Sequence, residues 1–443
     1  MVYEKYPWYR RFARSVRQEV RWLTPGLGVK RWLVVTLFGI SLVAIGVGVA
    51  VLEVYRTTPQ TWWLPVLSAI SLRALDRPLR VLVFASLGIG LILVGIWGMN
   101  RALLRPFVQP GIPVIDALSS FRRRERGPRI VAIGGGHGLA ALLRGLKAYT
   151  HNITAIVTVA DDGGSSGEIR RTMGILPPGD IRNCLAALSN DEALLTQVFQ
   201  YRFAAGAGLT GHSLGNLLIT ALTDLTGSFE EAVAESGRVL AVHGQVLPST
   251  LHDVRLAADI HFPNTNSKIH VKGESEIAKQ AGQVHRVWLE PSNAPAFPPA
   301  IAAILSADLI VVGPGSLFTS ILPNLLVPDL AEAIRASRAV KFYICNVATE
   351  PGETDGFNCG DHIRIIEKHI GNHLFDLVIC NNEYEKTLPA NITWVKVEPN
   401  LEEEYALYQA NLTDIENPLH HDSAKLAQSI TDLFYEKTGP LAG

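Results

Sequence analysis

Two adjacent carboxylates, Asp161 and Asp162, are the side chains in this 443-residue sequence best suited to acid–base or metal chemistry. They follow residues 153–160, an apolar and β-branched run that predicts a buried parallel strand. Small residues follow directly, namely Gly163, Gly164, Ser165 and Ser166. Glycines let backbone N–H groups turn towards a ligand, and Mg²⁺ favours one or two carboxylates together with phosphate oxygens. We therefore expect Asp161 and Asp162 to be catalytic or metal-binding, and the four small residues to contact a polar ligand.

A glycine-rich turn precedes this loop, between a predicted strand at 129–133 and a predicted helix at 139–149. It consists of Gly134, Gly135, Gly136, His137 and Gly138. A helix N-terminus behind such a turn offers free N–H groups to a phosphate. Gly136, Gly138 and Ala141 also match the spacing of the dinucleotide fingerprint, so an NAD-dependent oxidoreductase is a remote alternative. The alternative that these residues form a tight turn and bind no ligand also stays open.

A second turn of this kind follows the predicted strand 309–312 and contains Gly313, Gly315 and Ser316. The carboxyl ends of parallel strands share one edge of a sheet, so both turns are expected to border one crevice. Two such turns suit a ligand with a diphosphate and a second polar group better than they suit NAD.

Polar residues in three further segments are expected near the crevice: Asn183, His212, Asn216 and Asn346. His212 is a candidate general base, although a lone histidine is more often structural. Asp180 suits either the crevice or a simple helix cap. The carboxylates of residues 350–355 suit either the crevice or an exposed loop.

Short β-branched runs alternate with helical stretches beyond residue 129, which predicts an α/β fold with a doubly wound, mostly parallel sheet. The predicted strands are 129–133, 153–160, 239–242, 284–289, 309–312, 341–345, 377–380 and 392–397. Residues 254–260 and 268–272 predict an inserted β-hairpin. A closing helix is expected from about Asp422.

The N-terminal part has a different composition. Residues 1–129 carry 19 Lys and Arg against 6 Asp and Glu, whereas the remainder is acidic. Residues 32–52 and 81–99 contain no charge and are long enough to cross a membrane as helices. Basic residues flank this pair on both outer sides, so the positive-inside rule places both termini in the cytoplasm. We expect a multi-pass cell-membrane protein, and no nucleic-acid binding because the folded part is acidic.

The expected organisation therefore has four parts: a basic cytoplasmic segment at 1–31, a transmembrane hairpin at 32–100, a basic linker at 101–128, and a nucleotide-binding domain at 129–443. The four cysteines lack CxxC spacing, so the sequence predicts neither a zinc site nor a disulfide framework. Self-association into a homo-oligomer stays open.

Seven motifs in order, among them GGGHG, ADDGGSSG, PPGDIRNCL and GHSLGNLLI, resemble the YvcK-type gluconeogenesis factors (UPF0052). These are relatives of CofD, the phospholactate transferase of deazaflavin cofactor synthesis. The resemblance covers residues 129–400 and excludes the N-terminal part. His137 stands where the family usually has Thr, and Glu168 where it often has Arg. The second departure removes a cation and leaves Arg170, Arg171 and Arg182 as candidate phosphate partners.

The resemblance implies a Rossmann-like fold that binds a nucleotide diphosphate: a UDP-sugar in the YvcK branch, or a guanylyl phospholactate donor in the CofD branch. By the resemblance, the two glycine turns would hold the phosphates, with Asp161, Asp162, Asn183, Asn216 and Asn346 around them. The favoured function is a membrane-anchored UDP-sugar-binding protein required for cell shape during gluconeogenic growth. The alternative is a transferase of the 2-phospho-L-lactate type that uses Mg²⁺. The sequence leaves enzymatic activity open.

Overall fold

The computed structural model describes residues 114–439, apart from 190–192, 263–266, 278 and 281, together with scattered positions between 37 and 93. The chain divides into two compact units, Met1–Arg122 and Arg123–Gly443, and the second is described below. The predicted membrane spans 32–52 and 81–99 lie outside the described residues, apart from those scattered positions. No single described helix has the length and apolar composition to cross a membrane, although the bent pair Leu317–Leu325 and Pro328–Ala336 meets both criteria jointly.

A seven-stranded parallel sheet forms the centre of the second unit, which confirms the predicted α/β class. Its order is β10-β9-β8-β7-β1-β2-β3. The strands are β1 (Ile130–Gly134), β2 (Ile153–Val157), β3 (Gln245–Pro248), β7 (Leu309–Val312), β8 (Val340–Ile344), β9 (Leu377–Asn381) and β10 (Leu407–Ala410). Every residue of β1, β7 and β9 is buried, as expected for continuous apolar runs covered on both faces.

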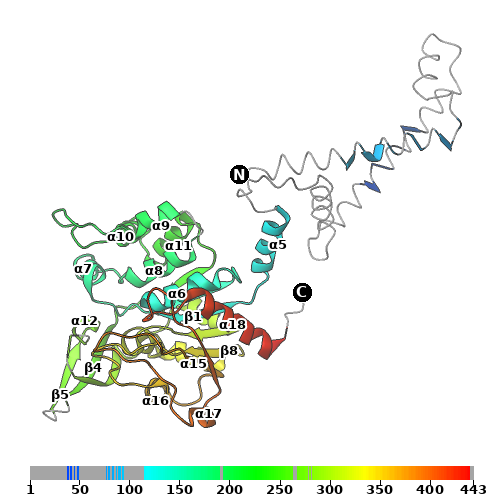
Figure 1. Cartoon of the computed structure of the whole chain (residues 1–443). Helices are drawn as coiled ribbons and strands as arrows, with labels where there is room; N and C mark the ends of the chain where they lie inside the picture. Colours follow the sequence, from blue (N-terminus) through cyan, green and yellow to red (C-terminus); the bar gives the residue numbers. More distant parts are fainter. Residues whose placement is uncertain are drawn as a thin grey trace, which may run out of the picture. The chain divides into compact units, whose positions relative to one another are not determined.

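Helices cover both faces of the sheet (Figure 1). One layer contains α6 (Gly136–Leu146), α8 (Gly179–Leu188) and α18 (Ser423–Thr438), and the other contains α15 (Pro328–Ala336) and α16 (Cys359–Ile370). The helix α13 (Pro298–Ser306) packs against α15. The helix α6 shows why these segments pack: Leu139, Leu142, Leu143 and Leu146 recur at helical spacing and are fully buried. Each such side chain contributes about 1.5–3 kcal/mol by burial. Asp422 caps α18, accepting from the N–H groups of Ala424 and Lys425, so the predicted closing helix is confirmed.

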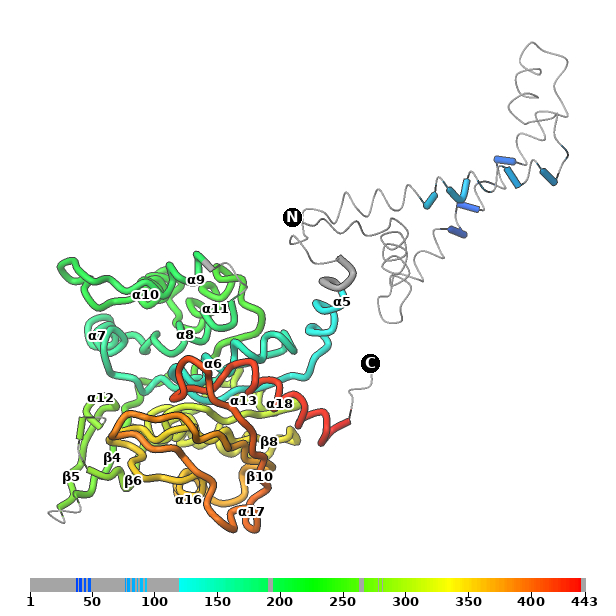
Figure 2. The backbone as a smooth tube through the Cα atoms, viewed as in Figure 1, coloured from blue at the N-terminus to red at the C-terminus, as the bar shows by residue number. Residues whose placement is uncertain are grey.

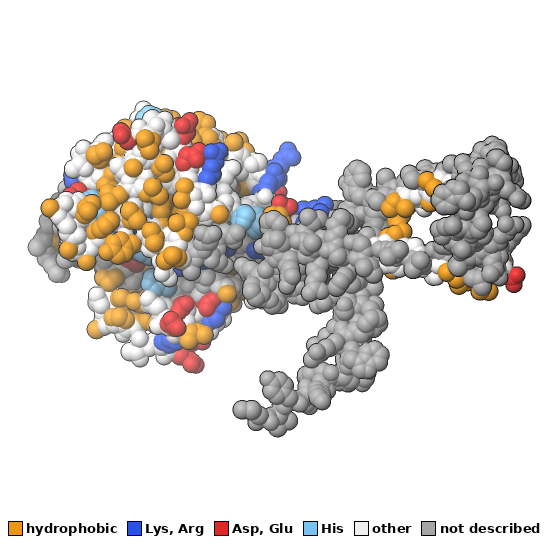
Figure 3. All heavy atoms as spheres, turned by 90° about the horizontal axis from the view of Figure 1, so that it is seen from above, with side chains coloured by type: hydrophobic (Ala, Val, Ile, Leu, Met, Phe, Trp, Pro, Cys, Tyr) orange, Lys and Arg blue, Asp and Glu red, His pale blue; other side chains and the backbone are white. Residues whose placement is uncertain are grey.

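Four helices form a lobe between β2 and β3 (Figure 2). They are α7 (Gly164–Met173), α9 (Ala193–Gln200), α10 (Leu214–Thr226) and α11 (Phe229–Val239). Figure 3, viewed from the side of this lobe, shows apolar side chains spread over the surface with few charges between them. Leu194 of α9 and Leu225 of α10 are among the exposed ones.

The inserted hairpin is confirmed and gains a third strand. The strands β4 (Arg255–Phe262) and β5 (Ser267–Lys272) pair antiparallel, and β6 (Gln283–Glu290) pairs with the other edge of β4. The prediction that residues 284–289 belong to the parallel frame was therefore wrong. A short helix, α12 (Glu274–Ile277), leads out of β5 towards the main sheet.

Two other predicted strands are also corrected. Residues 239–242 end α11 and turn, and the edge strand of the sheet forms at β3 instead. Residues 392–397 stay outside the sheet because their backbone bonds a loop: Thr349 N–H donates to Thr393 O at 2.8 Å, and Val395 N–H donates to Val347 O at 3.1 Å. The strand β10 takes the sheet edge in their place.

Candidate functional site

The topology fixes where a ligand can approach the sheet. The strands that follow β1, namely β2 and β3, lie on one side of it in the sheet. The strands that follow β7, namely β8, β9 and β10, extend the sheet in the opposite direction. The neighbours β1 and β7 therefore form the switch point of the sheet, where the connections diverge and leave a crevice beyond the carboxyl ends of the strands. Both glycine turns lie there, one after β1 and one after β7.

The two turns meet across this crevice. A Cβ atom placed on Gly138 would lie 2.6 Å from the carbonyl oxygen of Pro314, so only glycine permits this approach. Gly136 has φ +62°, a left-handed conformation that also favours glycine. After the second turn, Leu317–Ile321 form a π-helical turn, a local irregularity that recurs at functional sites. The prediction of a shared crevice is confirmed.

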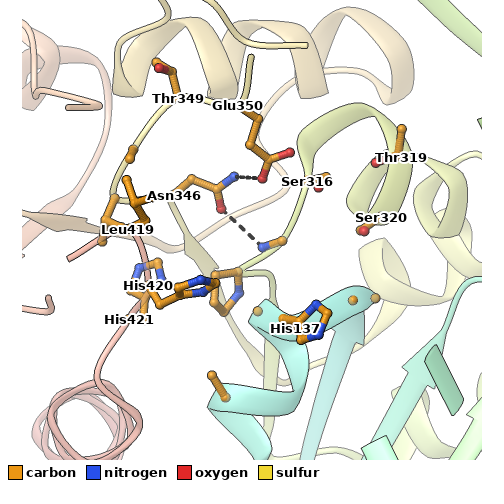
Figure 4. Close-up of a pocket in the computed structure, with 18 of the residues that line it drawn as sticks. His137, Ser316, Thr319, Ser320, Asn346, Thr349, Glu350, Leu419, His420 and His421 are labelled. Atoms are coloured by element: carbon orange, nitrogen blue, oxygen red, sulfur yellow. Dashed lines mark hydrogen bonds between the residues drawn. The ribbon is translucent and has the colours of Figure 1, made fainter. Parts of the chain in front are cut away.

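A single cavity of about 450 Å³ lies between the turns. That volume suits a small-molecule ligand. Of the predicted binding residues, the cavity is lined by Gly135, Gly136, His137, Gly138, Gly315, Ser316 and Asn346. Asn346 ties two walls together, because its Oδ1 accepts from Gly315 N–H at 3.2 Å and its Nδ2 donates to Glu350 Oε1 at 3.2 Å (Figure 4).

One wall of the cavity is acidic, formed by Asp161, Asp180 and Glu274. Burial raises the pKa of Asp161. Burial, followed by the charge of Asp161, raises the pKa of Asp180 to about 6, although the hydrogen bond from the Gly136 N–H lowers it. The pKa of Glu274 is raised well above its ordinary value by burial and by neighbouring carboxylates. Buried carboxylates with raised pKa values in a cleft are typical of functional sites, and a cation relieves their mutual repulsion.

The loop after β8 adds two more acids. Glu350 lines the cavity, and burial raises its pKa. Glu353 lies behind it, where Thr319 Oγ1 donates to its Oε1 at 3.2 Å. Burial and the charge of Glu350 raise the pKa of Glu353 to about 8. The alternative of a fully exposed acidic loop is therefore wrong for these two residues.

Asp162 does not share the cavity with Asp161. Its Oδ1 accepts from Ser275 N–H at 2.9 Å, so the side chain holds the start of α12. Asp161 Oδ1 instead accepts from Gly163 N–H at 2.8 Å, and the Ser166 hydroxyl donates to the same carboxylate. Adjacent residues of an extended segment point in opposite directions, which explains the separation.

Three of the remaining predicted residues, Ser165, His212 and Asn216, form a buried polar network in the helical lobe. Ser165 Oγ lies 2.9 Å from His212 Nδ1 and accepts from Asn216 Nδ2 at 3.0 Å. Glu168 Oε2 lies 3.3 Å from His212 Nε2. The predicted residues that do not line the cavity are Gly134, Asp162, Gly163, Gly164, Ser165, Ser166, Asn183, His212, Asn216 and Gly313.

Two of the three arginines expected near the phosphates, Arg170 and Arg182, are engaged elsewhere, and Arg171 donates to the carbonyl of Asp162 at 3.4 Å. Arg170 pairs with Asp253 and donates to the carbonyl of Val254. Arg182 donates to Ser213 Oγ and to Asn183 Oδ1. Among the residues that the structure describes, no Lys or Arg lines the cavity. Negative charge on a ligand must therefore be met by N–H groups, histidines or a bound cation.

The sequence reasoning missed the C-terminal wall of the cavity. Leu419, His420 and His421 lie opposite the first turn, beside His137 (Figure 4). Burial lowers the pKa of His421 to about 4, so its imidazole is neutral at pH 7. Thr319, Ser320 and Glu274 were missed as well. The one available signal was the position of His420 and His421 just before the cap of α18, because a helix start brings nearby polar residues to the edge of the sheet.

Comparison with known proteins places this site in a family. The profile of the family "2-phospho-L-lactate transferase CofD" matches residues 130–417. A gluconeogenesis-factor relative from Nostoc sp. is 50% identical over 379 residues, which cover 84% of this chain and 81% of that protein. The gluconeogenesis factor of Listeria monocytogenes is 43% identical over 322 residues, which cover 71% of this chain and 98% of its own.

A solved structure gives the same relationship. The crystal structure of a member of the UPF0052 family from Bacillus halodurans superimposes with a TM-score of 0.63 at 41% sequence identity. The match covers 69% of this chain and 99% of that one. The match therefore takes in almost an entire relative, and nearly a third of this chain has no counterpart there.

Proposed function

Since the chain belongs to the gluconeogenesis-factor family with a CofD-type domain, we propose that its cavity binds a nucleotide diphosphate-sugar, with a UDP-sugar as the ligand. The observation that carries this proposal is the approach of two glycine turns across one cavity at the switch point of the sheet. One turn suits the diphosphate, because it opens the helix α6, whose N-cap Gly135 has no side chain to occupy the helix N-terminus. The second turn, with Ser316 and Asn346, faces the other end of the ligand.

The acidic wall supports a role for Mg²⁺ in binding. A diphosphate beside Asp161, Asp180 and Glu274 would be repelled unless a cation lay between them. Carboxylate oxygens fit Mg²⁺, and burial, followed by the charge of Asp161, raises the pKa of Asp180 in the ligand-free protein. Asp161 and Asp180 would hold the ion, which would neutralise phosphate charge.

We assign a regulatory role to this binding, by which the protein supports cell shape during growth on gluconeogenic carbon sources. An anchor formed by residues 32–100 would keep the domain at the cytoplasmic face of the cell membrane. Loss of cell shape in a deletion strain on a gluconeogenic carbon source, rescued by the intact gene and not by a binding-deficient one, is the expected result.

The second candidate is phosphoryl-group transfer of the phospholactate type, favoured by the CofD profile and the acidic wall. An acceptor hydroxyl would attack phosphorus, its proton would pass to a carboxylate, and the nucleotide would leave. Asp180, with a pKa of about 6, suits a general base near neutral pH. The N–H groups of the two turns would stabilise charge on the transferred group.

Calorimetric titration of the full chain with UDP-GlcNAc, GDP and NAD, each with and without Mg²⁺, separates these functions. The regulator predicts Mg²⁺-dependent binding of UDP-GlcNAc, with the ligand recovered intact. Release of free nucleotide from a nucleotide-linked donor would establish the transferase instead. Preferential binding of NAD would favour the remote oxidoreductase alternative and contradict both.

A further inference from the structure

Three of the four cysteines meet in the core behind the cavity. Cys345 follows β8, Cys380 lies on the neighbouring strand β9, and Cys359 is the first residue of α16. The β8–β9 register pairs Ile344 with Ile379, which sets Cys345 and Cys380 side by side. The three sulfur atoms lie within 4.8 Å of one another, and Cys359 Sγ is 2.7 Å from Cys380 Sγ.

The position of Cys359 is fixed by the start of its helix. Asn358 and Asp361 form a capping box, in which each side chain accepts from the backbone N–H of the other residue. The loop of residues 346–358 begins directly after Cys345 and ends at this cap, directly before Cys359. Both of its ends are therefore next to a thiol. This convergence depends on the sheet register and on the cap, which is why CxxC spacing gave no sign of it.

Two buried polar atoms without hydrogen-bond partners in the described part of the chain lie on elements next to the thiols, the Tyr343 hydroxyl on β8 and Nε2 of His362 on α16. The Tyr343 hydroxyl is fully buried and has no hydrogen-bond partner among the described residues. Tyr343 lies on β8 two residues before Cys345, so the two side chains share one face of the strand. His362, three residues after Cys359, is buried too; its Nδ1 bonds Asn358 O at 2.9 Å, while its Nε2 has no described partner. Buried polar atoms without partners are costly, and a purely apolar cysteine cluster would not require them.

We propose that Cys345, Cys359 and Cys380 form a binding site for a thiophilic metal ion such as Zn²⁺, beside Tyr343 and His362. Three thiolates are a donor set that soft and borderline cations prefer. At a bond length of about 2.3 Å, thiolates on Zn²⁺ stand roughly 3.8 Å apart, so Cys359 and Cys380 need separate by only about 1 Å. Each thiol gives up its proton when it binds the ion.

The site has a consequence for the cavity, and this step rests on the proposed function. The loop 346–358 starts and ends at the thiols, and it carries Asn346 and Glu350 into the cavity. An ion across Cys345 and Cys359 would close the base of this loop and hold its polar side chains in place. Loading the metal is therefore expected to strengthen nucleotide binding.

The test uses the full chain, purified with reductant, stripped by a chelator and titrated with Co²⁺ and then Zn²⁺. One equivalent of Co²⁺ is expected to give thiolate charge-transfer absorption in the near ultraviolet, which Zn²⁺ then displaces. C359S and C380S are expected to weaken Zn²⁺ binding at least about a hundredfold, as judged with a competing chromophoric chelator.

The fourth cysteine provides the control. Cys184 is equally buried but lies on α8, outside the cluster, so C184S is expected to bind Zn²⁺ like the unmodified chain. Absence of thiolate absorption in the reduced, unmodified chain would overturn the proposal, whatever the variants do. So would an equal loss in C184S and C359S, or a Cys359–Cys380 disulfide in place of metal. UDP-GlcNAc titration with and without Zn²⁺ tests the coupling separately, so failure of the proposed function leaves the metal result intact.

Discussion

At the scale of single residues, the adjacent acids Asp161 and Asp162 have different surroundings. Asp161 lines the cavity beside Asp180, whereas Asp162 accepts from Ser275 N–H and fastens α12. The motif identified the correct place in the chain but not which carboxylate faces the ligand. That choice depends on the backbone direction at the end of β2, which residue types do not reveal.

The pair D161N and D162N tests this division. Both changes remove a charge and keep a hydrogen-bond acceptor, so folding should be largely preserved. D161N is expected to weaken Mg²⁺-dependent UDP-GlcNAc binding roughly tenfold or more, because a charged contact contributes about 1.5–3 kcal/mol. D162N should bind nearly normally in the same calorimetric titration. Equal losses in the two variants would contradict the assignment of Asp161 to the cavity.

Asp180 predicts a pH dependence of stability. Its folded pKa of about 6 lies above the ordinary value of 3.8, so the folded state favours the protonated form. This contribution to stability is fully present below pH 3.8 and is lost as the pH rises through 6. At pH 7.5 the carboxylate therefore destabilises the ligand-free protein by an amount on the order of 2 kcal/mol.

D180N keeps the shape of the side chain and removes this titration. Without nucleotide or Mg²⁺, the variant is expected to unfold at a higher temperature than the unmodified chain at pH 7.5, with the difference shrinking towards pH 5. Thermal unfolding followed by circular dichroism across this range measures the effect. A constant difference at every pH would show that titration of Asp180 is not its cause.

At the scale of elements, the function depends on how closely the turns after β1 and β7 approach each other. G138A would place a Cβ 2.6 Å from the backbone oxygen of Pro314, which cannot move aside as a side chain can. We expect a loss of about 1–3 kcal/mol of stability and a marked loss of nucleotide binding.

A matched substitution, G237A in α11, provides the control. Its Cβ would meet neighbours at 3.6 Å or more, and alanine suits a helix better than glycine. This variant should therefore be as stable as the unmodified chain, or more so, and bind normally. Normal nucleotide binding by G138A would show that the two turns do not have to meet for binding.

The elements also show how far sequence patterns reach. Central strands such as β1 and β7 were predicted because burial on both faces requires continuous apolar runs, and the turns after them because glycine is needed there. Residues 392–397 have the same composition as a strand, but they pair with a loop that becomes available only in the folded chain. His421 and the cysteine cluster reach their places through sheet order and helix caps, so local composition held little sign of either.

At the scale of the whole molecule, the family domain is one part of a longer chain. Relatives from Listeria monocytogenes and Bacillus halodurans match over 98% and 99% of their own lengths while covering 71% and 69% of this chain. The family domain therefore folds in proteins without a counterpart to the rest. Two segments without charge, 32–52 and 81–99, are preceded and followed by basic residues in this added part. This pattern supports the proposal that it anchors the domain to a membrane.

Deletion of residues 1–112 tests the anchor and the independence of the domain together. The full chain is expected in the membrane pellet after an alkaline carbonate wash, because two spans of about 20 apolar residues resist extraction. The shortened chain is expected in the supernatant, with unchanged affinity for UDP-GlcNAc, since every residue that lines the cavity lies beyond residue 134. Recovery of the full chain in the supernatant would contradict the anchor. Loss of nucleotide affinity in a well-folded shortened chain would instead show that the N-terminal part contributes to the site.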